Sequence, residues 1–422
     1  MISQEFHKEK RSDAAAGLLD RSLLIVFAGK APQRTGDQSY AFTPNRNFYY
    51  LTGVAKERSV LLMAKYEDCL EEVLLIEKPN PRKESRIGQM MDIDQARELT
   101  GIPTIRYLDE LDVCIAELLS NRGTLVERDF QNVYFDFETG DVGDPLDQAR
   151  MYARKIQDRF PYLQIQNIHH QLCNLRVCKE RSEIEKIRRA IEITDEGIKS
   201  MMRRVKAGLW EYELEAAFDY ELKVRGVKNP AFPSIIASGA NATVLHYEDN
   251  NQMVGEDELV LVDVGAEYDY YCADISRTFP VSGRFTPRQR ILYEIVLKAQ
   301  EATIEAMKPG QGLEQLLDIT KATMAAECQR VGLIKTAEEL SRYFFHGVSH
   351  YLGLDTHDVG GRNVKLAPGM VLTVEPGLYV PEENIGIRIE DDVLITADGH
   401  EVLSKQIIKT VEDIERFMQQ TT

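Results

Sequence analysis

The sequence is poor in cysteine and in long hydrophobic runs. Six cysteines stand among 422 residues, at positions 69, 114, 173, 178, 272 and 328, and no two of them form a C-x-x-C pair. Cysteines this sparse do not make a disulfide scaffold, so we expect reduced and mostly buried thiols. The apolar run LLIVFAG near the start is far too short to cross a bilayer. We therefore expect neither a disulfide-rich domain nor a membrane-spanning protein.

Basic charge is also scarce. The chain has 51 Lys and Arg against 68 Asp and Glu, a formal net charge of −17. Such a charge repels a phosphate backbone, and the basic residues form no strong cluster, so no nucleic-acid partner is expected. The start, MISQEFHKEKRSD, lacks the basic-then-apolar layout of an export signal. The expected location is the cytoplasm.

The length favours two domains. In roughly the first 170 residues, strand patterns alternate with helical patterns, which predicts an α/β domain without a dense group of histidines and carboxylates. The strands are expected at 21–29, 59–66, 71–78 and 123–129, and the helices at 92–101 and 108–121.

The rest of the chain, from residue 181 to about 412, has a weak internal repeat in its architecture. Each half contains two helices, a loop rich in glycine and two strands. In the first helix one apolar face is interrupted only by Thr194; its other members are Ile184, Ile187, Ile191, Ile198 and Met202. The helices are expected at 181–205, 210–226, 287–307 and 312–332, and the strands at 258–266, 270–281, 369–380 and 386–396.

The hairpin of the first half carries two aspartates. A turn at Tyr268 and Asp269 places Asp263 opposite Asp274 across the strands, and opposed residues have Cβ atoms roughly 4.5 to 5.5 Å apart. The run LVLV before Asp263 predicts burial.

The hairpin of the second half repeats this arrangement with glutamates. A turn at Glu382 and Glu383 places Glu375 opposite Glu390, and the apolar run MVLTV directly precedes Glu375 in the sequence. Buried like charges need protons or a cation, because one unpaired buried carboxylate costs several kcal/mol. The alternative is that the acids face solvent and each pairing is a coincidence of the assumed register. The recurrence in both halves favours a metal site.

A third signal is the segment HGVSHYLGLDTHDVG, which holds three of the eight histidines. His346 and His350 have the spacing of a zinc helix, but Gly347 and Gly353 favour a strand or loop. One of the two histidines can be a metal ligand while His357 reaches a substrate. Four carboxylates and one imidazole can hold two divalent ions, and this set suits Mn²⁺, Fe²⁺ or Co²⁺ better than a structural Zn²⁺.

These residues resemble a known family, the proline-specific branch of the pita-bread metallopeptidases, which includes aminopeptidase P and prolidase. The motifs that carry the resemblance are SYAFTPNRNFYYLTG, LRVCKERSEIEKIRRAIEIT, LVDVGAEYDYYCADISRTF, HGVSHYLGLDTHDVG, LAPGMVLTVEPGLYV and GIRIEDDVLIT, which span nearly the whole chain. The resemblance implies an α/β N-terminal domain at 1–172 and, at 173–422, an α+β pita-bread catalytic domain with pseudo-twofold halves.

The resemblance also implies a metal centre of two divalent ions, with Mn²⁺ first and Co²⁺, Fe²⁺ or Zn²⁺ as alternatives. Such ions activate water and polarise the scissile carbonyl. The implied ligands are Asp263, Asp274, His350, Glu375 and Glu390.

Further roles follow from the same resemblance. Glu375 is expected to move a proton as well as bind metal, while His246 and His357 contact the peptide and stabilise the tetrahedral intermediate. His346 is expected to shape the subsite for proline. His169, His170 and His400 receive no role.

Arg388 shares a face with Glu390 and, in the expected register, lies opposite Gly377. We interpret Arg388 as a catalytic partner of the acids and Tyr379 as a substrate-binding neighbour. A purely structural ion pair is the alternative for the arginine.

The expected reaction is removal of the N-terminal residue from peptides with proline in the second position. Ser349 favours aminopeptidase P, since prolidases often carry glycine there, but short segments around Glu375 keep a dipeptide-restricted prolidase open. The intact ligand set argues against a creatinase-like hydrolase and a noncatalytic peptide-binding protein, and the long leading domain argues against a methionine aminopeptidase. The resemblance also implies a homodimer or homotetramer.

Overall fold

The computed structural model describes residues 2–420, apart from 120–128, 139, 142 and 144–145. The chain divides into two compact units, residues 1–175 and 176–422, so the boundary falls at 175 where 172 is expected. The strand expected at 123–129 lies almost wholly outside the described residues. Within the part of the chain that the structure describes, no helix has both the length and the apolar character needed to cross a membrane.

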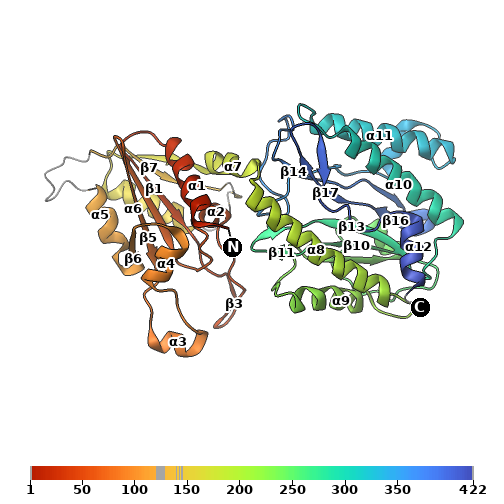
Figure 1. The fold of residues 1–422 in the computed structure, drawn as a ribbon, viewed down its shortest axis with the longest axis horizontal. Helices are drawn as coiled ribbons and strands as arrows, with labels where there is room; N and C mark the ends of the chain where they lie inside the picture. The colour runs from red at the N-terminus through yellow and green to blue at the C-terminus, as the bar shows by residue number, and fades with distance from the viewer. Residues whose placement is uncertain (1, 120–128, 139, 142, 144–145, 421–422) are drawn as a thin grey trace. The chain divides into compact units, whose positions relative to one another are not determined.

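The N-terminal unit is built on a six-stranded sheet with the order β6-β5-β4-β1-β7-β8 (Figure 1). Strands β1, β7 and β8 are parallel to one another, while β4 is antiparallel to β1. The strands expected at 21–29, 59–66 and 71–78 are confirmed as β1, β4 and β5. The strands are β1 (Ser22–Phe27), β4 (Val60–Tyr66), β5 (Cys69–Ile76), β6 (Thr104–Tyr107), β7 (Asn132–Phe135) and β8 (Gln164–Asn167), and a separate hairpin joins β2 (Gln33–Thr35) to β3 (Gln38–Ser39).

Helices cover both faces of this sheet, which confirms the α/β class. Because side chains alternate along a strand, Leu23 and Ile25 of β1 join a core cluster with α5 and α6, while Leu24 and Val26 join one with α1, α2 and α4. The expected helices at 92–101 and 108–121 correspond to α4 and to α5 with the short η1 before it. The helices are α1 (Gln4–Ala16), α2 (Arg46–Thr52), α3 (Pro81–Ile87), α4 (Ile93–Thr100), η1 (Leu108–Glu110), α5 (Leu111–Leu119), α6 (Gln148–Arg159) and α7 (His169–Val177).

The second unit contains the expected repeat. In each half two long helices pack together and precede an antiparallel strand pair, α8 and α9 before β10 and β13, then α10 and α11 before β14 and β17. The first half consists of α8 (Arg181–Arg204), α9 (Glu211–Val224), β9 (Ile235–Ser238), η2 (Gly239–Thr243), β10 (Leu259–Val264), β11 (Glu267–Tyr268), β12 (Tyr271–Cys272) and β13 (Ile275–Pro280). The second half consists of α10 (Pro287–Ala306), α11 (Leu313–Arg330), η3 (Ala337–Arg342), β14 (Val371–Val374), β15 (Gly377–Val380), η4 (Pro381–Glu383), β16 (Ile385–Arg388), β17 (Asp391–Ile395), β18 (His400–Val402) and α12 (Val411–Gln419).

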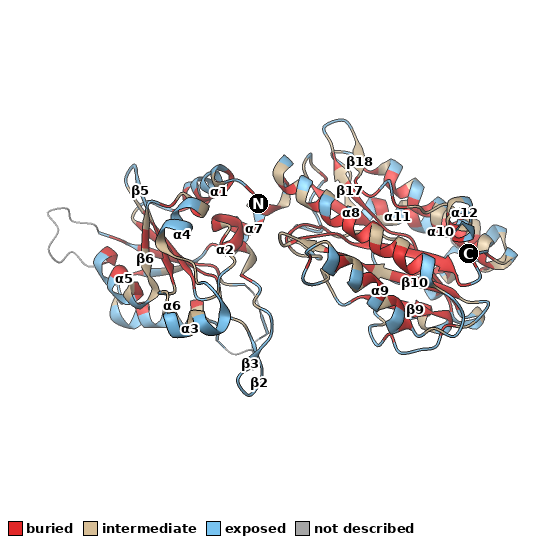
Figure 2. Ribbon diagram, turned by 60° about the horizontal axis from the view of Figure 1, so that its bottom comes forward, coloured by how far each residue is buried: buried red, intermediate tan, exposed pale blue. Residues whose placement is uncertain are grey.

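The apolar face of α8 is buried. Figure 2 shows that the strands of this unit are largely buried as well. Of the expected face only Ile184 remains half-buried. Thr194, its polar interruption, donates from Oγ1 to the Ala190 carbonyl at 2.9 Å and accepts the Ala266 amide at 2.9 Å. The one polar side chain of the face therefore ties the helix to the chain just after β10.

A close backbone contact joins the two halves beside the candidate site. A Cβ added at Gly386, in β16, would lie 1.8 Å from the carbonyl oxygen of Ala242, in η2. Only glycine allows this approach. Since η2 ends three residues before His246, the contact positions that histidine's segment against the second half.

Candidate metal centre and active site

The first hairpin carries Asp263 and Asp274, but in a different register from the expected one. Asp263 pairs with Ser276, because the turn is formed by Asp269 and Tyr270, one position later than expected. Both turn residues have positive φ, as a tight two-residue hairpin turn requires. The expected direct opposition of the two aspartates is therefore wrong by two positions. The two aspartates still lie close enough to interact: after burial, the charge of Asp263 is the next cause of the raised pKa of Asp274.

The second hairpin has the expected register. Gly377 pairs with Arg388, and the ladder on the other side of the acids keeps the same register, which sets Glu375 opposite Glu390. The turn contains the short helix η4, which includes the two residues expected there.

Hydrogen bonds between the two halves bring the two hairpins together. The Glu390 amide donates to the Ser276 carbonyl at 3.1 Å, and the Arg388 amide donates to Thr278 Oγ1 at 3.2 Å. Both acceptors belong to β13 of the first half. The acids of both halves therefore meet in one buried region.

His350 points into this region from an irregular segment, as expected for a loop. Its Nε2 lies 3.3 Å from Asp274 Oδ2 and 3.8 Å from Glu375 Oε1. Its Nδ1 lies 3.0 Å from the Tyr351 carbonyl, and donation there leaves Nε2 free to act as a ligand. One ligand atom from each of Asp274, His350 and Glu390 lies within 4.8 Å of the others.

The electrostatics of the acids call for a cation. Burial and the neighbouring carboxylates raise the pKa of Asp274 and of Glu390 well above the ordinary value, and burial raises the pKa of Glu375 to about 7. Among the described residues, the buried Oδ1 of Asp263 has no hydrogen-bond partner. Crowded buried acids and one imidazole fit divalent metal ions.

Arg388 forms the link between the acids and the neighbouring polar side chains. Its Nη2 donates to Asp263 Oδ2 at 2.7 Å, its Nη1 to the Tyr379 hydroxyl at 2.9 Å and its Nε to Ser276 Oγ at 2.7 Å. Ser276 in turn donates to Glu390 Oε2 at 2.9 Å. The expected contact of Arg388 with the acidic group is confirmed, and Ser276 is a member of the group that the sequence analysis missed.

His346 lies on the apolar side of the site. Its Nε2 is 3.0 Å from the Tyr379 hydroxyl, and its ring meets Phe344 edge-on at 5.0 Å between centroids. Burial first, and then the charge of Arg388, lower the pKa of His346 to about 4, so its imidazole is neutral near pH 7. The exposed ring of Phe345 lies 5.2 Å from that of Tyr379.

The other two candidate histidines lie at the open side. The His357 ring is 4.4 Å from the His350 ring, and burial, His350 and His246 lower its pKa. His246 is exposed, and its charge also contributes to lowering the pKa of His346. The fold thus brings all the candidate site residues together.

A buried ion-pair cluster next to His357 was not expected from the sequence. Asp358 lies 2.9 Å from Lys179 Nζ and 2.5 Å from Arg176 Nη2, and all three side chains are almost fully buried. Burial would raise the pKa of Asp358, but the two cations lower it. The signal was present in the segment LRVCKE, yet only the fold shows which acid these cations meet.

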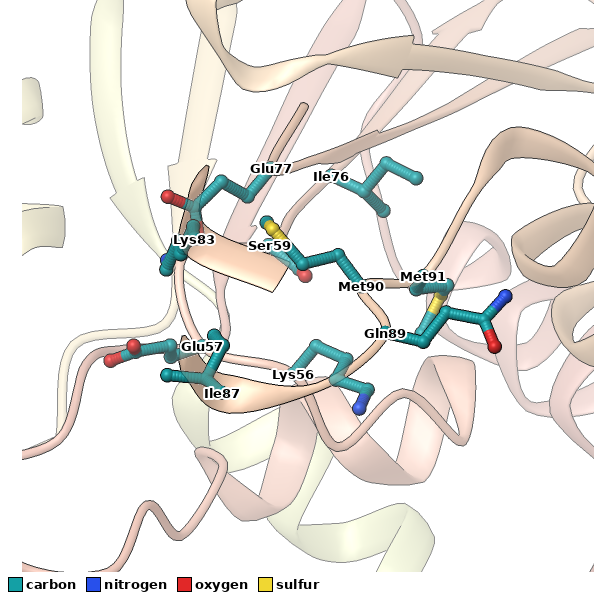
Figure 3. A pocket seen from close by; sticks show the side chains of 10 residues that line it. All are labelled: Lys56, Glu57, Ser59, Ile76, Glu77, Lys83, Ile87, Gln89, Met90 and Met91. Carbon is teal, nitrogen blue, oxygen red and sulfur yellow. The ribbon is translucent and has the colours of Figure 1, made fainter. Parts of the chain in front are cut away.

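A separate pocket lies in the N-terminal unit (Figure 3) and contains none of the candidate residues. Lys83 Nζ lies 2.5 Å from Glu77 Oε2 at its wall, and Met90 and Met91 supply apolar surface. Its charges are partly paired with one another, so its chemistry differs from that of the acidic centre.

The fold and the site define a metal-dependent hydrolase with an α/β leading unit and a pita-bread catalytic unit. Residues 185–397 match the model of metallopeptidase family M24, and residues 7–126 match that of the aminopeptidase P N-terminal domain. The chain therefore belongs to metallopeptidase family M24 and is a metallo-aminopeptidase.

Relatives cover both units of the chain. The Xaa-Pro aminopeptidase of Escherichia coli is 33% identical over 99% of this chain and 98% of its own. A solved structure from Bacillus anthracis, provisionally assigned as an aminopeptidase P, has a TM-score of 0.97 at 44% identity and covers 100% of this chain and 99% of its own. Zn-substituted E. coli aminopeptidase P in complex with product has a TM-score of 0.91 at 30% identity, with coverage of 100% and 99%.

Proposed function

We propose that this chain removes the N-terminal residue from peptides whose second residue is proline. The observation that carries the proposal is the convergence of four acids and one histidine in one buried centre, in a chain whose full-length relatives are named Xaa-Pro aminopeptidase. A noncatalytic binding protein has no need of crowded buried acids. The names of the relatives favour the aminopeptidase over the dipeptide-restricted prolidase.

We assign two divalent ions to the centre, Mn²⁺ first, while Co²⁺, Fe²⁺ and Zn²⁺ fit the same donors. When bound, such ions lower the pKa of water and polarise a peptide carbonyl. Arg388 donates a hydrogen bond to Asp263, and Ser276 donates one to Glu390. These hydrogen bonds fix the orientation of the two acids. The assigned ligands are Asp263, Asp274, His350, Glu375 and Glu390.

Three side chains act on the peptide itself. Glu375 is assigned to accept a proton and return it. In the metal-free chain burial raises its pKa to about 7. His357 has a lowered pKa and is a neutral N–H donor for the oxygen that gains charge in the tetrahedral intermediate. His246 contacts the peptide from the exposed side.

The subsite for proline lies beside His346. The ring of this histidine lies 5.0 Å from that of Phe344 and 6.3 Å from that of Phe345, between centroids. Proline brings a ring and no amide hydrogen once it is in peptide linkage, so a wall of apolar and aromatic atoms leaves no donor unsatisfied. Tyr379 borders this subsite through its contacts with His346 and Phe345.

Substrate length separates the two peptidase alternatives. Purified protein loaded with Mn²⁺ is incubated with Ala-Pro, Ala-Pro-Ala and Ala-Ala-Ala, and free alanine is measured over time. We expect release from Ala-Pro-Ala and little from Ala-Ala-Ala. Hydrolysis confined to Ala-Pro would assign the chain as a prolidase instead.

The proton-transfer role is tested with Glu375→Gln, which keeps the shape of the side chain. Turnover of Ala-Pro-Ala is expected to fall by about a thousandfold, as when an enzyme loses a general acid–base group that also binds metal. The control is Glu382→Gln in the same hairpin, whose side chain is 56% exposed. Unchanged turnover in Glu375→Gln would refute the assigned mechanism.

We also propose that the protein is cytoplasmic and forms a homodimer or homotetramer, as the family resemblance implies. The few cysteines and the lack of C-x-x-C pairs support a reducing compartment. Light scattering on the purified protein measures the number of subunits, and a monomer at micromolar concentration would contradict the proposal.

A further inference from the structure

A second chemically organised cluster lies in the N-terminal unit, at the end of strand β7. His169 Nδ1 is 2.6 Å from Asp136 Oδ1, and His169 Nε2 is 3.3 Å from Cys173 Sγ. Asn47 Nδ2 donates to the other oxygen of Asp136 at 3.0 Å. His169 and Cys173 are four residues apart in α7, so both side chains point to the same face of the helix.

The order of these contacts is that of an activated nucleophile. A carboxylate fixes the imidazole through Nδ1, which aims Nε2 at the sulfur, and the carboxylate is itself held by an amide. The Asp136 hydrogen bond first, and then the Cys173 contact, raise the pKa of His169 to about 10. The imidazole is therefore protonated near pH 7, and an imidazolium beside a sulfur favours the thiolate.

The cluster is partly accessible from solvent. The His169 side chain is 17% exposed, while Cys173 beside it is buried, with 9% of the residue exposed. The neighbouring ring of His170 lies 6.0 Å from that of His169. Asp136 is nearly buried and is the acid that contacts His169, so its charge compensates the imidazolium.

We propose that Cys173, His169 and Asp136 form a nucleophilic thiol site that exchanges with small disulfides. His169 Nε2, 3.3 Å from Cys173 Sγ, carries the proton that the departing sulfur takes up. The thiolate attacks one sulfur of the disulfide, a new S–S bond forms to Cys173, and the original S–S bond breaks. The departing sulfur takes the electron pair and the His169 proton, which leaves a mixed disulfide on the protein. This site is independent of the proposed peptidase function.

The probe is dithiodipyridine, a small disulfide, applied to the full-length protein, with modified cysteines located by mass spectrometry of peptides. At about pH 6 an ordinary thiol is well under 1% thiolate, so Cys173 is expected to react about tenfold faster than the exposed Cys69 and Cys178. The Cys173 rate should be nearly constant between about pH 6 and about pH 8. A Cys173 rate that is slower than those of the exposed cysteines, or that rises with pH as theirs do, would overturn the proposal.

Matched variants identify the cause of the reactivity. His169→Gln removes the cation and should give Cys173 the pH dependence of Cys178, whereas His170→Gln should leave the plateau unchanged. Circular dichroism verifies that each variant is folded. The wild-type pH profile decides the question even where a variant does not fold. A plateau that persists in folded His169→Gln would show that the imidazole is not responsible.

Discussion

Arg388 shows how much one side chain organises in this molecule. It is 1% exposed and its three donor atoms reach Asp263, Tyr379 and Ser276, two of which lie in the other half of the unit. Burial alone would lower its pKa, but Tyr379 and the acids raise it, so the guanidinium stays charged. A planar fork with several fixed donors can satisfy this geometry, whereas a single ammonium cannot.

At the residue scale we therefore predict that Arg388→Lys lowers kcat/KM for Ala-Pro-Ala by about ten- to a hundredfold, because a supporting contact of a metal site is lost. The metal content of the purified protein should fall in parallel, which elemental analysis measures. Arg342→Lys, at a side chain 64% exposed, serves as the control and should be neutral. Wild-type kinetics and metal content in Arg388→Lys would contradict this role.

The segment after His350 is held in place by the chain that precedes α8. Asp358 follows His357 directly and contacts Lys179 and Arg176, which come from the start of the second unit. A buried carboxylate that loses one of its cations is left incompletely compensated. The lowered pKa of Asp358 adds stability above the ordinary pH range of an aspartate, and this stability is lost as the pH falls through the folded-state value.

At the element scale we predict that Lys179→Met lowers the free energy of unfolding by about 3 to 5 kcal/mol, the cost of breaking a buried pair. It should also lower kcat more than it raises KM, because His357 shifts with its neighbour. Urea unfolding and steady-state kinetics measure the two effects. Arg181→Met breaks an exposed pair with Glu185 and should cost about 1 kcal/mol or less. Equal losses in the two variants would contradict the assignment.

At the scale of the whole molecule, the second unit closes around acids that repel one another. Without metal, the raised pKa values of Asp274, Glu375 and Glu390 mean that the folded chain retains protons that the unfolded chain releases. The contribution of these three acids to the stability of the metal-free fold is therefore largest at low pH and is lost as the pH rises toward about 7, the pKa of Glu375. Bound cations remove this penalty.

We accordingly predict that the gain in Tm on adding Mn²⁺ to chelator-treated protein grows from about pH 5.5 to about pH 8. Differential scanning fluorimetry at several pH values measures it, with Mg²⁺ as a comparison ion. A gain that is constant or largest at low pH would show that the acids do not carry the metal.

The two hairpins show where prediction from the sequence succeeds and where it stops. The strand pairing predicted for the second hairpin agrees with the structure. The pairing predicted for the first hairpin is two positions off, because Asp269 and Tyr270 form the turn with positive φ and no glycine marks it in the sequence. The periodicity of α8 was readable because it is a local pattern. The family motifs supplied the candidate site residues, which the fold brings together.

The sequence by itself determined the α/β leading unit, the helices and strands of the repeated halves and the acids that end two buried strands, because periodicity and turn chemistry act over a few residues. Only the tertiary structure decided that Arg388 bridges the halves, that Asp358 meets Lys179 and that Asp136 meets His169. These partners lie tens to hundreds of residues apart, and their meeting depends on how whole elements pack. Local pattern carries no information about such contacts.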